Sequence, residues 1–176
     1  MKRNVLIFGS ILGMILAGHV VYMMTLVYQN PDFQSNDVVG YAAMVVVFSL
    51  TFFGIRNYRN KQLHGTISLG RAFKTGALIA LVGATFYVVI GLSYYYLFIP
   101  DFLDKYIEHV MIQATRNGAT AAELAAKTKE MEQFREMYKN PLFVVLISYA
   151  EVLPVGLVVA FIGSLILKRK PKSSTV

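Results

Sequence analysis

The sequence predicts an all-α membrane protein, a four-transmembrane-helix bundle with an extracytoplasmic helical hairpin between helices three and four. Of its 176 residues, 56% are hydrophobic and only 15% are charged, whereas a soluble domain carries about 25% charged residues. The charges gather in segments that separate four long apolar stretches. Between the third and fourth stretches, apolar residues recur at helical spacing, which indicates helices outside the membrane. We expect residues 1–176 to form a single membrane domain.

Four windows are long and apolar enough to cross a membrane, which takes about 20 mainly apolar residues. They cover about residues 5–28, 38–55, 72–99 and 142–167. The third window corresponds to about 42 Å of helix, whereas the hydrocarbon core of a bilayer is about 30 Å thick. We therefore expect the third helix to tilt or to project from the membrane.

The placement of Lys and Arg predicts the orientation of the chain. Cations without any acid occur before the first window, between the second and third, and after the fourth, at Lys2, Arg3, Arg56, Arg59, Lys61, Arg71, Lys74, Lys168, Arg169, Lys170 and Lys172. Cytoplasmic loops of membrane proteins are enriched in such residues. We therefore expect a multi-pass protein of the bacterial inner membrane with its N-terminus and C-terminus in the cytoplasm.

A cleaved signal peptide is the alternative interpretation of the N-terminal segment. Residues 1–4 resemble its charged start, and Leu16-Ala17-Gly18 resembles a cleavage site. The apolar sequence continues to Tyr28, well past the usual apolar region of a signal peptide. This favours a membrane-spanning helix that is retained.

The segment of about residues 100–141 is predicted to form the outer hairpin. Its first half has apolar residues at helical spacing, namely Phe102, Leu103, Tyr106, Ile107 and Val110. The pattern breaks at Asn117-Gly118, and Thr120 with Glu123 then forms a capping box that begins a second helix. Asn140-Pro141 ends this helix before the fourth window.

Three of the windows carry small residues at every fourth position. Small side chains let helix backbones approach closely within a membrane, where the hydrophobic effect between helices is weak. We interpret these positions as helix-packing residues within the chain, with homodimerisation through a lipid-facing ridge as the alternative. The residues are Gly9, Gly13 and Ala17 in the first window, Gly76, Ala80 and Ala84 in the third, and Gly156, Ala160 and Ser164 in the fourth.

Two ionisable residues, His19 and Glu151, lie within predicted spans at matching depths. Both are about 13 Å below the outer boundary at about 1.5 Å per residue, so they are expected to meet if their helices are neighbours. A carboxylate in lipid costs about 3 kcal/mol and should face the bundle interior. Near that depth, further polar side chains could complete an intramembrane polar cluster, namely Tyr22, Ser93, Tyr94, Ser148 and Tyr149.

Three interpretations of this cluster remain open from the sequence. It is a structural hydrogen-bond network that fixes the helix register, a proton- or ion-linked site, or a pocket for a small molecule or lipid head group. An ionisable residue inside a membrane is a functional hypothesis by default. The chain lacks the paired broken helices of repeat transporters.

The sequence offers no catalytic signature, metal site or cofactor motif. Cysteine is absent, so disulfides and thiolate ligands are excluded. His19, His64 and His109 are far apart in the sequence, and His109 beside Glu108 is expected on a solvated surface. The net charge of +7 does not indicate nucleic-acid binding, because the cations flank membrane spans. We expect a protein that is not an enzyme.

Several segments resemble a known family. They are residues 53–59 (FGIRNYR), 65–76 (GTISLGRAFKTG), 100–102 (PDF) and 151–156 (EVLPVG). Together they are similar to domain-of-unknown-function family 4199, uncharacterised small bacterial membrane proteins found mainly in Bacteroidetes. The resemblance covers nearly the whole chain and implies a four-helix inner-membrane protein. It implies no activity and no catalytic residues.

The expected function is that of a non-enzymatic scaffold or accessory subunit acting through partners. Besides the lipid bilayer, those partners would be another membrane protein or a second copy of the chain. This hypothesis predicts that the apolar face of the hairpin is exposed in the monomer. The alternative is a small transporter or channel subunit with a proton- or ion-linked site at Glu151 and His19, which predicts a water-accessible cavity that reaches the pair.

Overall fold

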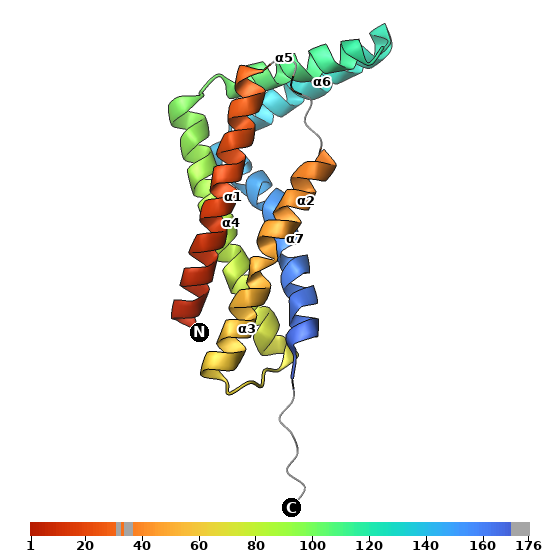
Figure 1. Cartoon of the computed structure of the whole chain (residues 1–176). Helices are drawn as coiled ribbons and strands as arrows, with labels where there is room; N and C mark the ends of the chain where they lie inside the picture. The colour runs from red at the N-terminus through yellow and green to blue at the C-terminus, as the bar shows by residue number, and fades with distance from the viewer. Residues whose placement is uncertain (31–32, 34–36, 170–176) are drawn as a thin grey trace, which may run out of the picture.

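The computed structural model describes residues 1–30, 33 and 37–169, and this part of the chain is built from α-helices (Figure 1). They are α1 (Lys2–Gln29), α2 (Asp37–Phe48), α3 (Leu50–Gln62), α4 (Leu69–Phe98), α5 (Phe102–Arg116), α6 (Ala121–Tyr138) and α7 (Pro141–Leu167). Four stretches are long and apolar enough to span a membrane, namely Lys2–Gln29, Val38–Gln62, Leu69–Phe98 and Pro141–Leu167. The two shorter helices α5 and α6 lie between the third and fourth. The predicted fold class is confirmed.

The N-terminus, the α3–α4 loop and the end of α7 lie at one end of the bundle, and the hairpin lies at the other (Figure 1). The amino group of Met1 donates a hydrogen bond of 2.6 Å to the side-chain carbonyl of Gln62 at the end of α3. Ile67 and Arg169 form an isolated antiparallel bridge. The predicted cytoplasmic segments that the structure describes are therefore neighbours in space.

The second span is longer than predicted and is divided at Ser49. The apolar window of residues 38–55 ends before Arg56, but the helix continues to Gln62. Arg and Lys are good helix formers, so α3 extends the span with a charged end. At Ser49 the hydroxyl donates to the carbonyl of Val46 at 2.6 Å. Such a bond competes with the backbone ladder and bends helices.

α4 is the central helix of the bundle, because it packs extensively against both α1 and α7. The approach is close where small residues face each other. A Cβ atom added to Gly13 of α1 would lie 2.6 Å from the Cβ atom of Phe86 on α4. One added to Gly76 of α4 would lie 2.9 Å from the Cβ atom of Ala160 on α7.

The small-residue ridges of the three windows all lie inside the chain. The nine buried residues are Gly9, Gly13, Ala17, Gly76, Ala80, Ala84, Gly156, Ala160 and Ser164. These surfaces are already occupied by neighbouring helices. A homodimer would therefore have to form through another face of the protein.

The hairpin has the turn and cap that the sequence predicts. Gly118 adopts φ +80°, a left-handed conformation that glycine takes without strain. Thr120 then caps α6 in a capping box with Glu123, whose carboxylate accepts from the Thr120 backbone N–H at 2.7 Å. The side chain of Asn140 accepts from the backbone N–H of Leu142 at 3.0 Å and begins α7.

Contacts at its base fix the hairpin to the bundle. The Tyr28 hydroxyl at the end of α1 donates to Asp101 at 2.9 Å, and the Lys105 ammonium lies 3.8 Å from the centroid of the Tyr28 ring. Within the hairpin itself, Arg135 of α6 forms a 2.7 Å ion pair with Asp104 of α5. The base is therefore held by polar bonds, while the two helices extend away from the bundle (Figure 1).

Little large apolar surface of the hairpin is exposed. Among residues 102–138, Met137, at 44%, is the one large hydrophobic side chain that is exposed. The partner hypothesis predicted a larger exposed apolar face. The expectation that His109 lies on a solvated surface is wrong, because this residue is 6% exposed on a helix that contacts both α1 and α6.

Replacing Gly13 with alanine should destabilise the bundle, whereas Gly18→Ala on the same helix should not. The added methyl at position 13 would collide with Phe86, while position 18 has no atom within 4 Å. Overpacking of this kind costs about 1–3 kcal/mol. Thermal unfolding in detergent micelles, followed by circular dichroism, measures the difference. Equal midpoints for the two variants would contradict the close approach of α1 and α4.

Candidate functional site

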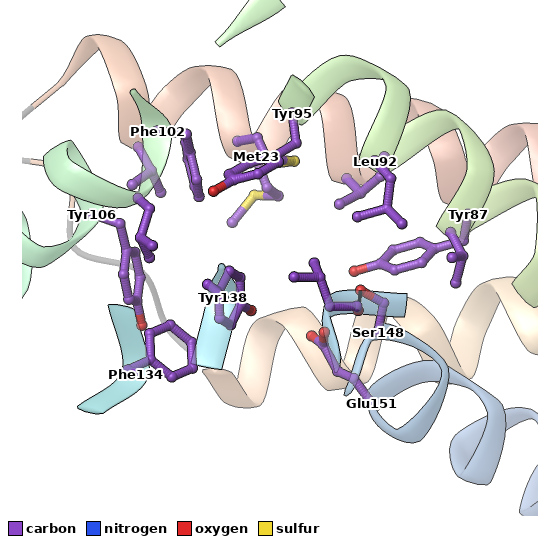
Figure 2. A pocket seen from close by; sticks show the side chains of 17 residues that line it. Met23, Tyr87, Leu92, Tyr95, Phe102, Tyr106, Phe134, Tyr138, Ser148 and Glu151 are labelled. Atoms are coloured by element: carbon purple, nitrogen blue, oxygen red, sulfur yellow. Dashed lines mark hydrogen bonds between the residues drawn. The ribbon is translucent and has the colours of Figure 1, made fainter. Parts of the chain in front are cut away.

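A cavity of about 360 Å³ lies where the hairpin meets the bundle (Figure 2). All the long helices except the second span contribute to it, and α5 and α6 close it from the hairpin side. Its lining residues are Val20, Met23, Met24 and Val27 of α1, Tyr87, Val88, Gly91, Leu92 and Tyr95 of α4, Phe102, Leu103 and Tyr106 of α5, Phe134 and Tyr138 of α6, and Val144, Ser148 and Glu151 of α7.

Helical periodicity explains why these residues share one space. On α4, Tyr87, Gly91 and Tyr95 follow one another at intervals of four, so they lie on one face. Gly91 leaves room there, because a Cβ atom at this position would be 3.5 Å from its nearest neighbour, Val20. The predicted excess length of α4 carries Tyr95 to the level of the hairpin, where its ring meets that of Phe102 at a centroid distance of 6.2 Å.

The wall of the cavity is mostly aromatic and aliphatic, with a few polar groups. In Figure 2 the Glu151 carboxylate and the Tyr87 hydroxyl both point into the space. The Ser148 hydroxyl donates to the Val144 carbonyl of its own helix at 2.8 Å. Among the described residues that line the cavity, none is Lys, Arg or His. Glu151 is therefore the one residue of this described lining whose side chain carries a formal charge.

Glu151 on α7 lies near Tyr138 at the end of α6. Burial, and then the negative charge of Glu151, raise the pKa of the Tyr138 hydroxyl to about 12, compared with about 10 for an ordinary tyrosine. The hydroxyl therefore stays neutral at physiological pH and remains a hydrogen-bond donor.

The seven predicted polar residues do not form one cluster. Ser148 and Glu151 line the cavity. Tyr149 instead donates its hydroxyl to Thr85 at 2.9 Å, which links α7 to α4. The Tyr94 hydroxyl shares a 2.8 Å hydrogen bond with Thr25, which links α4 to α1. These two tyrosines therefore fasten helices together outside the cavity lining.

The other three residues lie elsewhere on their helices. Tyr22 is 61% exposed, and Ser93 is exposed with its hydroxyl donated to the Val89 carbonyl at 2.7 Å. His19 is half-buried on α1, outside the lining of the cavity that contains Glu151. Equal depth fixes the height of a residue in the membrane but not the side of the helix on which it lies. The helices that carry His19 and Glu151, α1 and α7, both pack extensively against α4.

The aromatic half of the site was not predicted from the sequence. Four hairpin rings complete the lining, those of Phe102, Tyr106, Phe134 and Tyr138. The signal was present in their spacing, because two residues four positions apart lie on the same face of a helix. It did not show that these faces turn back onto the bundle. Within the described ranges 1–30, 33 and 37–169, no group of three or more His, Asp or Glu is placed to hold a metal ion.

Four long apolar helices with a helical hairpin between the third and fourth define a multi-pass membrane protein. The chain belongs to the family described as protein of unknown function DUF4199, whose model matches residues 6–169. The resemblance found in the sequence is therefore confirmed. Neither a curated protein nor a solved structure matches the chain.

Tyr138 should resist ionisation, and Glu151→Gln should make it ionise more easily. Removing the neighbouring negative charge lowers the cost of forming a tyrosinate. The pH titration of tyrosine ¹³Cζ resonances measures this, with Tyr138→Phe identifying the signal. In the wild type, the Tyr138 signal should remain that of the neutral form at pH ~11, above the ordinary tyrosine pKa of about 10. A titration that Glu151→Gln leaves unchanged would contradict the proximity of the two side chains.

Proposed function

We propose that this chain is a non-enzymatic accessory protein that holds a small amphipathic molecule in the cavity beneath the hairpin. The single observation that carries the proposal is the cavity itself, which both the bundle and the hairpin build. Ligand pockets typically measure about 300–1,000 Å³ and combine apolar walls with a few convergent polar groups. The cavity of about 360 Å³ has this character, with Glu151, Ser148, Tyr87 and Tyr138 among its polar groups.

Binding is favoured over catalysis by the state of the polar groups. The hydroxyl of Ser148, the one aliphatic hydroxyl among the described lining residues, donates its proton to the Val144 carbonyl. An activated nucleophile gives its proton to a base within hydrogen-bond reach, whereas this hydroxyl gives its proton to a backbone carbonyl. The cavity is therefore suited to holding a molecule.

The proposal includes the location and the orientation of the protein. We place the chain in the bacterial inner membrane with both termini in the cytoplasm, because Lys and Arg gather in the segments at that end. The hairpin then lies on the extracytoplasmic side. A ligand would reach the cavity from that side or from the outer leaflet.

The accessory role rests on the surface that the second span presents. α2 exposes several large apolar side chains, namely Val38, Val39, Tyr41, Val45 and Val46. Lipid covers such a surface in the monomer, and a membrane-protein partner or a second copy would compete with lipid for it. A partner that bound the hairpin would contact mainly polar side chains, because Met137 is the one exposed large hydrophobic residue among residues 102–138.

A small transporter or channel subunit is the second candidate. It is favoured by an acidic residue on a membrane-spanning helix that lines a cavity, because such residues mark ion and substrate pathways. His19, the other half of the predicted site, lies outside the lining. Glu151 would then carry the proton or ion without His19.

Filling the cavity should remove the bound molecule. Gly91→Leu places a side chain into the cavity, whereas Gly40→Leu is a matched change at a position with no atom within 4 Å. Native mass spectrometry after purification from native membranes should find a small molecule on the wild type and on Gly40→Leu and none on Gly91→Leu. Retention by Gly91→Leu, with all three proteins folded, would contradict the proposal. The same preparations would show any accessory partner.

Reporter fusions should place the hairpin outside the cell. Alkaline phosphatase, which is active after export, should be active when fused at Asn117 and inactive when fused after Leu167. A fluorescent protein at the second position should be fluorescent. The opposite pattern would overturn the proposed orientation.

A further inference from the structure

We propose that the ligand of this cavity is an organic cation, an ammonium group that carries an apolar portion. This inference rests on the proposed function and names the chemical class of the molecule. Three features support it: the sign of the charge in the lining, the aromatic character of the wall, and the accessibility of the carboxylate.

The charge in the cavity favours a cation. Glu151 is acidic, and the described lining residues include no Lys, Arg or His. A fatty acid or a phosphate would bring a second negative charge next to Glu151 and would find no cationic side chain in that lining. An ammonium group would form a charge-assisted hydrogen bond with the carboxylate.

The aromatic wall favours the same class of molecule. Six rings belong to the lining, and they come from three helices, α4, α5 and α6: Tyr87, Tyr95, Phe102, Tyr106, Phe134 and Tyr138. Figure 2 shows these rings around the space into which Glu151 points. The face of an aromatic ring carries negative electrostatic potential and attracts a cation within about 6 Å. The rings and the carboxylate therefore both favour the binding of a cation.

The carboxylate is reachable from the cavity. Although Glu151 lies on a membrane-spanning helix, its side chain is exposed. Its neighbour Tyr138 offers a neutral hydroxyl, which can accept a hydrogen bond from an ammonium N–H. The aliphatic residues Val20, Leu92 and Val144 line the same space and suit the apolar portion of the ligand.

Two sources could supply this chemistry. One is a free hydrophobic amine, and the other is the ammonium head group of a lipid such as phosphatidylethanolamine. Both present a positive nitrogen beside an apolar group, and the cavity wall recognises what they share. Competition by defined lipids distinguishes the two sources.

The test compares benzylammonium, whose N–H groups can donate to the carboxylate, with ethylbenzene, its uncharged isostere. Binding to the full chain is measured by titration calorimetry in uncharged maltoside micelles, with empty micelles as the blank. The wild type should bind the cation at least about tenfold more tightly than the isostere. Glu151→Gln should lower the affinity for the cation about tenfold or more and leave that for the isostere unchanged.

Matched variants separate charge recognition from misfolding. Glu151→Asp retains the carboxylate and should retain the preference for the cation. Glu132→Gln removes an exposed acid of α6 that is outside the cavity lining, and it should change neither affinity. Phosphatidylethanolamine should displace the cation if the lipid is the natural source, with phosphatidylglycerol as the control. Absence of displacement would assign the site to a free amine.

The outcomes distinguish this inference from the proposed function. Equal binding of the two probes, or an unchanged cation affinity in Glu151→Gln, would overturn the inference. The cavity would still be a binding site if Gly91→Leu weakened the binding of both probes. If neither probe bound the folded wild type in a way that Gly91→Leu abolished, both proposals would fail.

Discussion

The close approach of α4 to its two neighbours is the constraint on which the rest of the structure depends. Within lipid, the hydrophobic effect contributes little to helix association. Van der Waals packing at short range must therefore stabilise the contact between helices. Gly13 beside Phe86 and Gly76 beside Ala160 allow that approach on the two sides of α4. Because α4 is held between α1 and α7, its outer end is fixed. The face that carries Tyr87, Gly91 and Tyr95 then becomes one wall of the cavity.

The cavity is a consequence of two kinds of packing that meet. Deep in the bundle, small residues bring backbones together and leave no space. Towards the hairpin, the ridges give way to large side chains such as Met23, Tyr87 and Tyr95. Rings cannot interdigitate as closely as glycine and alanine do. The space between them is closed by α5 and α6, and the Tyr28–Asp101 hydrogen bond connects the start of the hairpin to α1.

Much of the fold could be predicted from the sequence, because the physics behind it is local. The spans follow from the absence of charge, the α6 cap follows from Thr120 and Glu123, and the turn follows from Gly118. The candidate site was less predictable. Sequence spacing gives the depth of His19 and Glu151, but the rotation of each helix is set by packing against its neighbours. Likewise, the apolar face of α5 was evident from the sequence, whereas the surface that it covers is a tertiary property.

The position of Glu151 in the chain has a consequence for how the protein is made. α7 leaves the ribosome after the other three spans described here, and it brings both the Glu151 carboxylate and the second extensive contact of α4. Until α7 is in place, the α4 face around Gly76 lacks its contact with Ala160, and the cavity lacks Val144, Ser148 and Glu151. Insertion of α7 therefore contributes to the bundle and to the cavity at the same step.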